Sequence, residues 1–458
     1  METRLKRPLS GQHVHFVAIG GVGMAALAEL LIGMGYTVSG SDLKESRTVS
    51  RLLELGADIK VGPHRAHYAD GADHVVFSNA VRPDNAEVAR GQQTGAEVLT
   101  RAQLLGRLVD AGRGVAVTGT HGKTTTSSMI ARVLDSAGFE PSFIIGGDLN
   151  DVGSGAALGT SDILVAEADE AFGSFLEIHP EIAVVTSIDR DHLEHYEDQA
   201  EIDEAFVTFL EGRRTRGWAV LCADDPGIRR VRSKITGNVA TYGVADADLV
   251  VGNGSAIWRG TPVGRIELAV PGVHNVLNAG AALVTALLLD ADGGAALEAL
   301  RRFGGVDRRF SVRGEEAGVI VVDDYAHNPR KVAVTLAAAR GAYPGRRIVA
   351  LFQPHLYSRT LHLAGEFGAA FDDADIVVVT DVYGQREDPI PGVSGQLVSE
   401  AVRRRAPKGV TTIYLPRLEE AAGFVAGIAQ DGDVVITMGA GDVTTAAPRI
   451  LRLLGERE

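Results

Sequence analysis

The chain has 458 residues, of which 45% are hydrophobic, and this length suggests about three domains. Its formal net charge of −14 argues against a nucleic-acid scaffold, because binding along a phosphate backbone needs Lys and Arg in excess on one face. A lone cysteine excludes an internal disulfide framework, and the charged first ten residues are unlike a secretory signal. No run approaches the roughly 20 apolar residues that a membrane span needs. A cytoplasmic protein without membrane insertion is therefore expected.

Up to about residue 110, short β-branched runs alternate with helical segments, and this alternation predicts a parallel sheet. Strands are expected at residues 14–19, 37–39 and 75–77, with helices from residue 24 and around residue 52.

The first of these strands runs into Gly20-Gly-Val-Gly-Met24, a glycine turn at a helix start. Backbone N–H groups at such a helix end can bind a diphosphate, although a tight strand-to-helix turn has the same pattern. Asp42, about 20 residues on, could accept a hydrogen bond from a ribose or base. Ser41 or Asp42 could equally cap the next helix. The glycines alone would suggest a nicotinamide-dependent dehydrogenase.

Residues 115–129 place an apolar strand, a Gly- and Thr-rich loop and a helix start in succession, and this order predicts a nucleoside triphosphate site. Gly119 and Gly122 let backbone N–H groups turn toward phosphate oxygens, while Lys123 supplies a positive charge. Val117 stands where a complete Walker A sequence has its first glycine. A noncatalytic ATP-binding regulator would also have such a loop.

Two acidic segments, residues 167–170 and 187–194, each follow a predicted strand of the central region. Carboxyl ends of parallel strands meet at one edge of a sheet, so both segments are expected beside the phosphate loop. Thr124, Glu167 and His192 could then hold magnesium with ATP. Acidic residues after strands are also common as solvated loop residues. A later stretch, around residues 244–270, is irregular and could hold an antiparallel element.

The segment of residues 271–278 has amide side chains, at Asn275 and Asn278, that could donate and accept hydrogen bonds at an adenine edge. An N-capped helix explains them equally well.

After residue 310 the alternation of strands and helices restarts, and it predicts a doubly wound domain. Its buried strands are expected at residues 319–322, 348–352, 376–380 and 434–437. Three of these strands lead into polar segments. Arg359 suits a planar carboxylate, and His327 and His355 suit a polar substrate, although any one histidine is more often a structural hydrogen-bonding group.

The loop Thr118-Gly-Thr-His-Gly-Lys-Thr124 resembles that of the Mur ligase superfamily, which forms amide bonds with ATP in peptidoglycan synthesis. The other polar segments, in this order and over nearly the whole chain, are similar to the same family. His121 is typical of the members that join L-alanine to the lactyl carboxylate of UDP-N-acetylmuramate and of the murein-peptide recycling ligase. The glycine turn, the segment 352–360 and the segment 387–392 favour the alanine-adding members.

The resemblance implies an α/β fold of three domains. These are an N-terminal Rossmann-like UDP-sugar-binding domain (residues 1–110), a central P-loop ATPase-like domain for Mg²⁺ and ATP (111–311) and a C-terminal Rossmann-like amino-acid-binding domain (312–458). The implied ATP-binding residues are Gly119, Thr120, His121, Gly122, Lys123, Thr124, Thr125, Asn275, Asn278 and Asp324. The implied substrate-binding residues are Gly20, Gly21, Gly23, Met24, Asp42, Ser78, Arg309, His327, His355 and Arg359. Magnesium would lie on Thr124, Glu167 and His192.

In the implied mechanism the sugar carboxylate attacks the γ-phosphate of ATP, and L-alanine then displaces phosphate from the resulting acyl phosphate. The implied catalytic residues are Lys123, His192, His327 and Arg359.

The sequence departs from the family pattern in three places. Ala171-Phe172 stands where Ser-Asp is common, Ser187 and Asp189 stand where Asn and Glu are usual, and Asn328 and Arg330 replace His and Thr. These changes are expected to bear on the sugar or amino acid and to leave ATP binding intact. A murein-peptide recycling ligase, or a related ligase with another sugar or amino acid, therefore stays open, as do glycine or serine in place of L-alanine.

Overall fold

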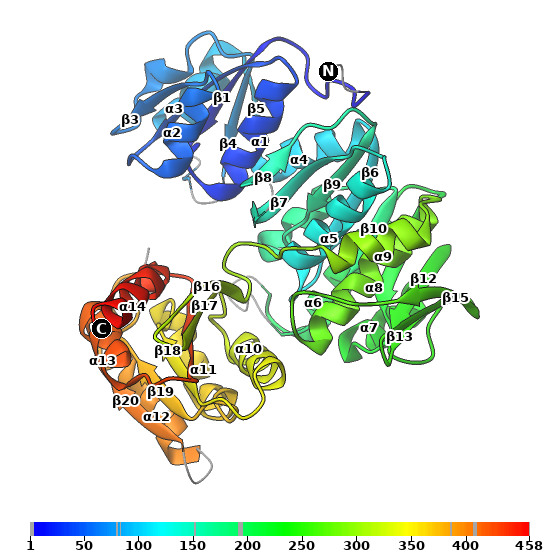
Figure 1. The fold of residues 1–458 in the computed structure, drawn as a ribbon. Helices are drawn as coiled ribbons and strands as arrows, with labels where there is room; N and C mark the ends of the chain where they lie inside the picture. Colours follow the sequence, from blue (N-terminus) through cyan, green and yellow to red (C-terminus); the bar gives the residue numbers. More distant parts are fainter. Residues whose placement is uncertain are drawn as a thin grey trace. The chain divides into compact units, whose positions relative to one another are not determined.

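The computed structural model describes residues 4–78, 81–82, 84–150, 153–190, 196–384, 387–405 and 410–457, apart from the side chain of Phe172. Within these residues the strands form three sheets (Figure 1). The chain divides into two compact units, Met1–Ala269 with Val276–Gly304 and Val270–Asn275 with Gly305–Glu458. Among the described helices none combines the length and apolarity required to cross a bilayer.

The first sheet is parallel throughout, as the sequence predicts, with the order β3-β2-β1-β4-β5 in the described chain. Its strands are β1 (His13–Val17), β2 (Thr37–Asp42), β3 (Asp58–Val61), β4 (His74–Phe77) and β5 (Glu97–Thr100). The helices between them are α1 (Val22–Gly33), α2 (Arg47–Glu54), the 3₁₀-helix η1 (Ala66–Ala69), α3 (Ala86–Thr94) and α4 (Arg101–Asp110). The edge strands β3 and β5 lack long β-branched runs, and the sequence did not predict them.

The second sheet has the order β15-β14-β13-β12-β11-β10-β6-β9-β7-β8 over the residues described. Its strands are β6 (Arg113–Thr118), β7 (Ser142–Leu149), β8 (Ser154–Ala157), β9 (Ile163–Glu167), β10 (Ile182–Val185), β11 (Trp218–Cys222), β12 (Asn238–Gly243), β13 (Leu249–Gly252), β14 (Ser255–Trp258) and β15 (Thr261–Arg265). The antiparallel element expected at residues 244–270 is confirmed, because β13, β14 and β15 pair in that sense. The helices are α5 (Lys123–Ser136), the 3₁₀-helices η2 (Ala171–Glu177) and η3 (Arg232–Lys234), α6 (Gln199–Glu211), α7 (Pro226–Val231), α8 (Val273–Leu288) and α9 (Gly293–Arg301).

The third sheet has the order β16-β17-β21-β18-β19-β20 in the described residues, with only β16 antiparallel to its neighbour among these pairs. Its strands are β16 (Ser311–Glu316), β17 (Val319–Asp324), β18 (Ile348–Phe352), β19 (Ile376–Val379), β20 (Thr411–Tyr414) and β21 (Val434–Met438). Its helices are α10 (Pro329–Ala342), α11 (Tyr357–Ala370), α12 (Gln396–Arg405), α13 (Leu418–Ile428), the 3₁₀-helix η4 (Asp442–Thr445) and α14 (Ala446–Gly455).

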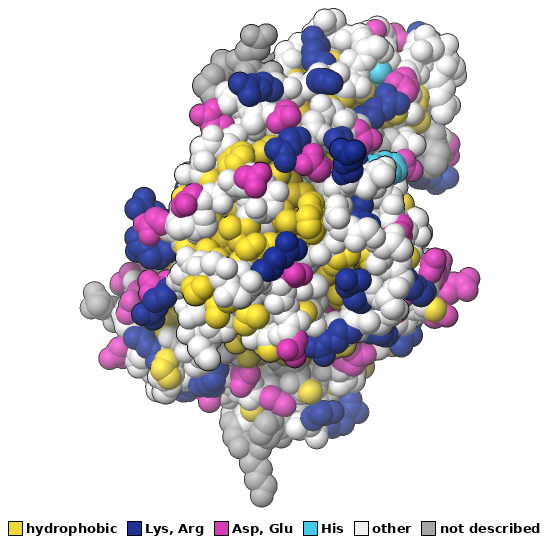
Figure 2. Space-filling model, turned by 90° about the vertical axis from the view of Figure 1, so that its right-hand side faces the viewer, with side chains coloured by type: hydrophobic (Ala, Val, Ile, Leu, Met, Phe, Trp, Pro, Cys, Tyr) yellow, Lys and Arg dark blue, Asp and Glu magenta, His cyan; other side chains and the backbone are white. Residues whose placement is uncertain are grey.

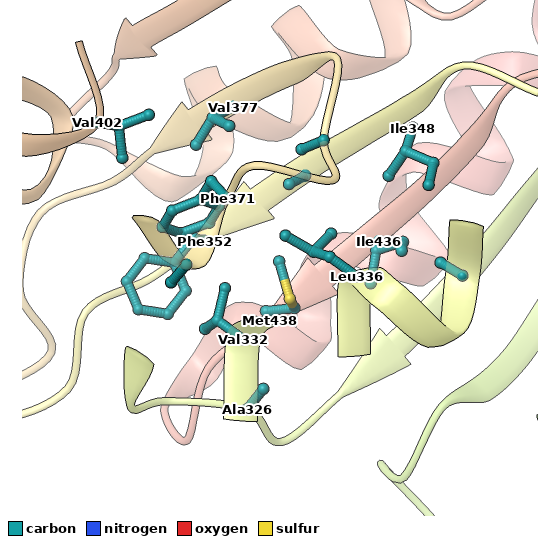
Figure 3. Packing of buried hydrophobic residues seen from close by; sticks show 14 of the residues in the cluster. Ala326, Val332, Leu336, Ile348, Phe352, Phe371, Val377, Val402, Ile436 and Met438 are labelled. Carbon is teal, nitrogen blue, oxygen red and sulfur yellow. The ribbon is translucent and has the colours of Figure 1, made fainter. Parts of the chain in front are cut away.

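Both faces of the third sheet are covered, as its continuous apolar strands predict. Along β18, Ala350 and Phe352 join one hydrophobic cluster while Leu351 joins another, and successive side chains of a strand point to opposite faces. Figure 3 shows the first cluster, in which Phe352 and Phe371 pack with side chains of α10 and β21. The doubly wound arrangement is therefore confirmed.

Strand order decides which segments meet at the carboxyl ends of the strands. In the second sheet β6 lies between β10 and β9, so the phosphate loop that follows β6 is flanked by the segments after those two strands. In the third sheet β21 and β18 are neighbours of β17 and β19, which brings the segments after these strands together. Figure 2 shows Lys and Arg interspersed with Asp and Glu on the face that it displays, so the described surface there has mixed charge.

Candidate active site

The phosphate loop joins the end of β6, at Thr118, to the start of α5, at Lys123. Gly119 and Gly122 both have a positive φ, of 131° and 82°, in a region that residues with a side chain rarely adopt. A Cβ at Gly119 would also lie 2.3 Å from Thr186 Oγ1. These glycines are therefore required by the turn, and the first N–H groups of α5 face outward from it.

The segment after β10 holds this loop through several hydrogen bonds. The amide of His121 donates to Ser187 Oγ at 2.9 Å, and the amide of Asp189 donates to Thr120 Oγ1 at 2.9 Å. Thr186 Oγ1 donates to the carbonyl of His121 at 2.5 Å. The ring of His121 also pairs with the carboxylate of Asp189, with Nε2 and Oδ2 3.4 Å apart.

This geometry corrects one expectation from the sequence. Ser187 and Asp189 depart from the family pattern, and they were expected to affect the sugar or amino acid and not ATP binding. Both lie against the phosphate loop, because β10 and β6 are neighbours in the sheet. The departure at Phe172 lies outside the described side chains.

Lys123 is the cation of the loop. Its Nζ donates to the carbonyl of Gly119 at 2.9 Å and to Glu170 Oε2 at 2.6 Å, and Asp169 is 3.9 Å away. Burial by itself lowers the pKa of Lys123, but Glu170, Asp169 and Glu167 together raise it above its ordinary value. The ammonium group therefore stays charged in a mostly enclosed position.

Thr124 and Glu167, two of the expected magnesium ligands, lie together. Thr124 Oγ1 donates to Glu167 Oε1 at 3.2 Å, and Glu167 Oε2 accepts from the amide of Gly146 at 2.8 Å. A hydroxyl and a carboxylate are hard oxygen donors of the kind that Mg²⁺ takes together with phosphate oxygens, so this pair fits the ion. His192 lies outside the described residues. Among those described, no group of at least three His, Cys, Asp or Glu side chains is arranged to hold a metal.

Asn278 also reaches the phosphate loop. Its Oδ1 accepts from Thr126 Oγ1 at 3.1 Å, and a Cβ at Gly122 would lie 2.6 Å from the same oxygen. Thr125 is half-buried in the first turn of α5. Asn275 belongs to the other compact unit, where its side chain donates to the carbonyl of Pro271 at 2.6 Å. The structure therefore places Asn278 beside the loop.

In the first sheet, Asp42 is bound to the glycine turn. Its Oδ2 accepts from the amide of Gly20 at 2.9 Å, and its Oδ1 accepts from the amide of Lys44 at 3.2 Å. The alternative that Ser41 or Asp42 caps the next helix is wrong, because Ser46 is the N-cap of α2.

The other expected sugar-binding residues lie at the same end of this sheet. Gly21 is the N-cap of α1, and a Cβ at Gly23 would approach the Arg101 side chain. Ser78 follows β4 and is half-buried. The side chain of Met24 is buried, and a Cβ at Gly21 would lie 4.0 Å from its Cγ.

In the unit that holds the third sheet, His327, His355 and Arg359 come together. The rings of His327 and His355 lie 5.8 Å apart, and Arg359 Nη1 donates to His355 Nδ1 at 3.2 Å. Nδ1 of His327 donates to the carbonyl of Tyr325 at 2.8 Å, which leaves Nε2 as the acceptor of the neutral ring. Burial, with Lys331 and Arg359 nearby, holds the pKa of His327 well below its usual range.

The start of α11 is fixed by the segment after β19. Both Ser358 N and Ser358 Oγ donate to the carboxylate of Glu387, at 2.9 Å and 2.5 Å. The ring of His355 stacks on that of Tyr383, with centroids 6.0 Å apart. Leu356, the residue after His355, has a φ of 69°, a strained value for a residue with a γ-branched side chain. Sequence reasoning gave Tyr383 no role, because a tyrosine after a strand has no distinctive signal.

Asp324 and Arg309 each contact neighbouring residues of their own unit. Asp324 accepts from the amides of Phe310 and Ala326, each at 2.7 Å, and from Thr335 Oγ1 at 3.2 Å. Burial raises the pKa of Asp324, although Arg309 acts in the opposite direction. The guanidinium of Arg309 lies over the ring of Tyr325 at 5.0 Å. A contact of Asp324 with ATP stays a prediction.

Three family models match the chain, one after another. The Mur ligase family catalytic domain matches residues 13–113, the Mur ligase middle domain matches residues 117–286, and the Mur ligase glutamate ligase domain matches residues 308–441.

Curated relatives match over nearly the full length. The UDP-N-acetylmuramate--L-alanine ligase of Pelobacter propionicus is 45% identical over 97% of this chain and 98% of its own. The protein of the same name from Trichlorobacter lovleyi is 46% identical over 97% of this chain and 99% of its own.

Among solved structures, the UDP-N-acetylmuramate-alanine ligase MurC of Thermotoga maritima has a TM-score of 0.80 at 28% identity, covering 98% of this chain and 100% of that one. A murein peptide ligase from Psychrobacter arcticus has the same fold, with a TM-score of 0.71 at 24% identity over 97% and 99% of the two chains. The chain belongs to the Mur ligase family.

Proposed function

We propose that this ligase joins L-alanine to the lactyl carboxylate of UDP-N-acetylmuramate, with ATP as the source of energy and Mg²⁺ as the cofactor, in the cytoplasm. The observation that carries the proposal is the phosphate loop with Lys123, Thr124 and Glu167 around it. It occurs in a chain 45% identical to a protein named UDP-N-acetylmuramate--L-alanine ligase. The product would be a precursor of peptidoglycan.

A carboxylate is a poor electrophile, so amide formation needs an activated leaving group. In the first step the sugar carboxylate attacks the γ-phosphorus of ATP, which gives an acyl phosphate and ADP. The N–H groups at the start of α5 and the ammonium of Lys123 stabilise the charge on the phosphoryl oxygens. Thr124, Glu167 and, by resemblance, His192 would hold Mg²⁺, which would supply positive charge that stabilises the transferring phosphoryl group.

In the second step the amino group of L-alanine attacks the acyl carbon and phosphate leaves through a tetrahedral intermediate. Arg359, which His355 orients at 3.2 Å, holds the amino acid's carboxylate in this proposal. His327 is neutral with Nε2 as an acceptor, so it can accept a hydrogen bond from the ammonium of the incoming amino acid and position it.

Binding of the sugar nucleotide is assigned to the glycine turn of the first sheet. The N–H groups at the start of α1 suit a diphosphate, and Asp42 holds the turn through Gly20. We also propose domain boundaries near residues 110 and 311, which separate the region for the sugar nucleotide from the regions for ATP and for the amino acid.

The experiment is a phosphate-release assay of the purified protein with ATP and Mg²⁺. UDP-N-acetylmuramate and its N-glycolyl counterpart are each combined with L-alanine, glycine, L-serine or murein tripeptide. Phosphate release that requires both UDP-N-acetylmuramate and L-alanine supports the proposal. Phosphate release that instead requires UDP-N-acetylmuramate and murein tripeptide would show that the protein is a recycling ligase.

A further inference from the structure

A buried polar cluster lies beneath the glycine turn of the first sheet, on the face that α3 covers. We call it the Glu87 cluster; its members are His13, His15, Ser39, Ser41, His64 and Glu87. The histidines and serines come from β1, β2 and the loop after β3, and Glu87 is the second residue of α3. The proposed reaction uses none of them.

Glu87 is completely buried and joins the ends of the first strands. Its Oε2 accepts from His15 Nε2 and from Ser41 Oγ, each at 2.7 Å, and its Oε1 accepts from His64 Nδ1 at 2.8 Å. Although burial acts to raise it, the pKa of Glu87 is lowered, because these three side chains stabilise the charged form. Glu87 is therefore a carboxylate with all of its partners in place.

A series of hydrogen bonds also connects β1 to Glu87. It runs from the carbonyl of Gly71 to His13 Nδ1 (3.0 Å), from His13 Nε2 to Ser39 Oγ (2.7 Å), from Ser39 Oγ to His15 Nδ1 (2.8 Å), and from His15 Nε2 to Glu87. Glu87 is therefore linked to both histidines of β1 as well as to Ser41 and His64.

Other ionisable groups surround this series of hydrogen bonds: Asp73 accepts from the amide of His13 at 2.9 Å, His74 on β4 pairs with Glu97 at 3.2 Å, and Arg90 on α3 pairs with Asp70 at 2.6 Å. Each of these already has its own partner.

The cluster connects directly to the proposed sugar-nucleotide site. The hydroxyl of Ser41 is bound to Glu87, and its carbonyl accepts from the amide of Ile19 at 2.9 Å. The next residue, Asp42, accepts from Gly20 at 2.9 Å. Asp42 also accepts, through its carbonyl, from the amide of Gly62 in the loop that leads to His64. A displacement of Ser41 would therefore move both the glycine turn and Asp42.

We propose that Glu87 is a positioning residue for the sugar nucleotide, because its carboxylate holds Ser41 and His64 in place. The proposal rests on the assignment of the glycine turn to the UDP-sugar. It predicts that the cluster affects the binding of that substrate and not of ATP, whose loop lies on another sheet.

The test is Glu87→Gln, which keeps the size of the side chain but places N–H donors opposite the donors that Glu87 accepts. We expect the KM for UDP-N-acetylmuramate to rise about tenfold or more, while the KM values for ATP and L-alanine change by less than about twofold. Glu97→Gln, which removes a half-exposed carboxylate from the same sheet, is the matched control and should leave all three KM values unchanged. Equal increases in all three KM values for Glu87→Gln would overturn the proposal in favour of a purely structural role.

A second measurement does not depend on activity. We expect the Kd of the full chain for UDP-N-acetylmuramate to rise about tenfold or more in Glu87→Gln and to stay unchanged in Glu97→Gln. An unchanged Kd in folded Glu87→Gln would overturn the proposal. Binding of the sugar nucleotide without ligase activity in the unaltered protein would instead refute the proposed function.

Discussion

Lys123 of the phosphate loop forms an ion pair with Glu170 of the segment after β9, with Nζ 2.6 Å from Oε2. Only 14% of the Lys123 side chain and 4% of the Glu170 side chain are exposed. The ammonium that we propose for the phosphates of ATP therefore also neutralises a buried carboxylate. Removing a single partner of such a pair leaves an uncompensated charge, at a cost of about 3–5 kcal/mol.

The first prediction follows from this double role. Lys123→Met should reduce ADP formation by several orders of magnitude, because the charge at the transferring phosphoryl group is lost. It should also lower the thermal unfolding temperature, and the double variant Lys123→Met, Glu170→Gln should recover much of that loss without recovering activity. ADP release and thermal unfolding of the purified variants test both parts. Near-normal ADP formation in the folded single variant would refute the assignment of the loop.

The second prediction concerns magnesium. Glu167 and Thr124 lie 3.2 Å apart, so Glu167→Gln weakens one oxygen ligand while keeping its shape. The Mg²⁺ concentration for half-maximal ADP formation should rise about tenfold or more. Glu211→Gln alters a carboxylate on α6 that binds Thr236 and serves as the control, with no change expected. An equal Mg²⁺ requirement in the two variants would remove Glu167 from the metal site.

Much of the fold could be predicted from the pattern of apolar residues. Strands such as β18, with five buried residues in succession, are read directly because a parallel sheet is covered on both faces. The weak edge strands could not be predicted. In β3 the sequence Asp-Ile-Lys-Val buries only Ile59, and its pairing depends on β2, about 20 residues away in the chain.

The site was predictable where a short motif carries its own geometry, and less so where residues distant in sequence meet. The phosphate loop joins β6 to α5 as expected, and within the other compact unit His327, His355 and Arg359 lie close to one another. Residues 187–194 were expected beside the phosphate loop, but the hydrogen bond between Ser187 and the amide of His121 was not foreseen, because the sequence does not show which side chain of the segment faces the loop.

The third prediction tests that attachment. Ser187→Ala removes the acceptor for the amide of His121, so the phosphate loop should become less ordered and the KM for ATP should rise, by about threefold to tenfold. Ser187→Asn, which restores the residue common in the family, should keep the KM for ATP close to that of the unaltered protein. A change confined to the KM for L-alanine would return Ser187 to the amino-acid site.

The fourth prediction concerns acid stability. Burial, together with Lys331 and Arg359, holds the pKa of His327 well below its usual range, whereas in the unfolded chain the ring titrates near 6.5. As the pH falls below about 6.5, the unfolded state binds a proton that the folded state does not, so the folded state loses stability.

His327→Gln removes this contribution. Between about pH 7 and pH 5 the free energy of unfolding should therefore fall less in His327→Gln than in the unaltered protein. Urea unfolding at the two pH values measures the difference, and His362→Gln, at an exposed position of α11, is the control. An identical pH dependence in His327→Gln and the unaltered protein would show that His327 is protonated with equal ease in both states.

The last prediction separates the two steps of the proposed reaction at Arg359. If Arg359 holds the carboxylate of L-alanine, Arg359→Ala should raise the KM for L-alanine by about tenfold to a hundredfold, because a lost charged hydrogen bond costs a few kcal/mol. Arg359→Lys keeps the charge but not the planar pair of donors, so its KM for L-alanine should lie between those of the unaltered protein and Arg359→Ala. Arg403→Ala, at an exposed position of α12, is the control.

The acyl phosphate forms before the amine is needed, so hydroxylamine in place of L-alanine should still trap it as a hydroxamate in Arg359→Ala. Arg359 also donates to His355, and a general collapse of this group would disturb both half-reactions. Hydroxamate formation together with a raised KM for L-alanine therefore identifies a carboxylate pocket. Loss of the hydroxamate would assign Arg359 to the ATP half-reaction, and an unaltered L-alanine dependence would place the pocket elsewhere in the unit that contains the third sheet.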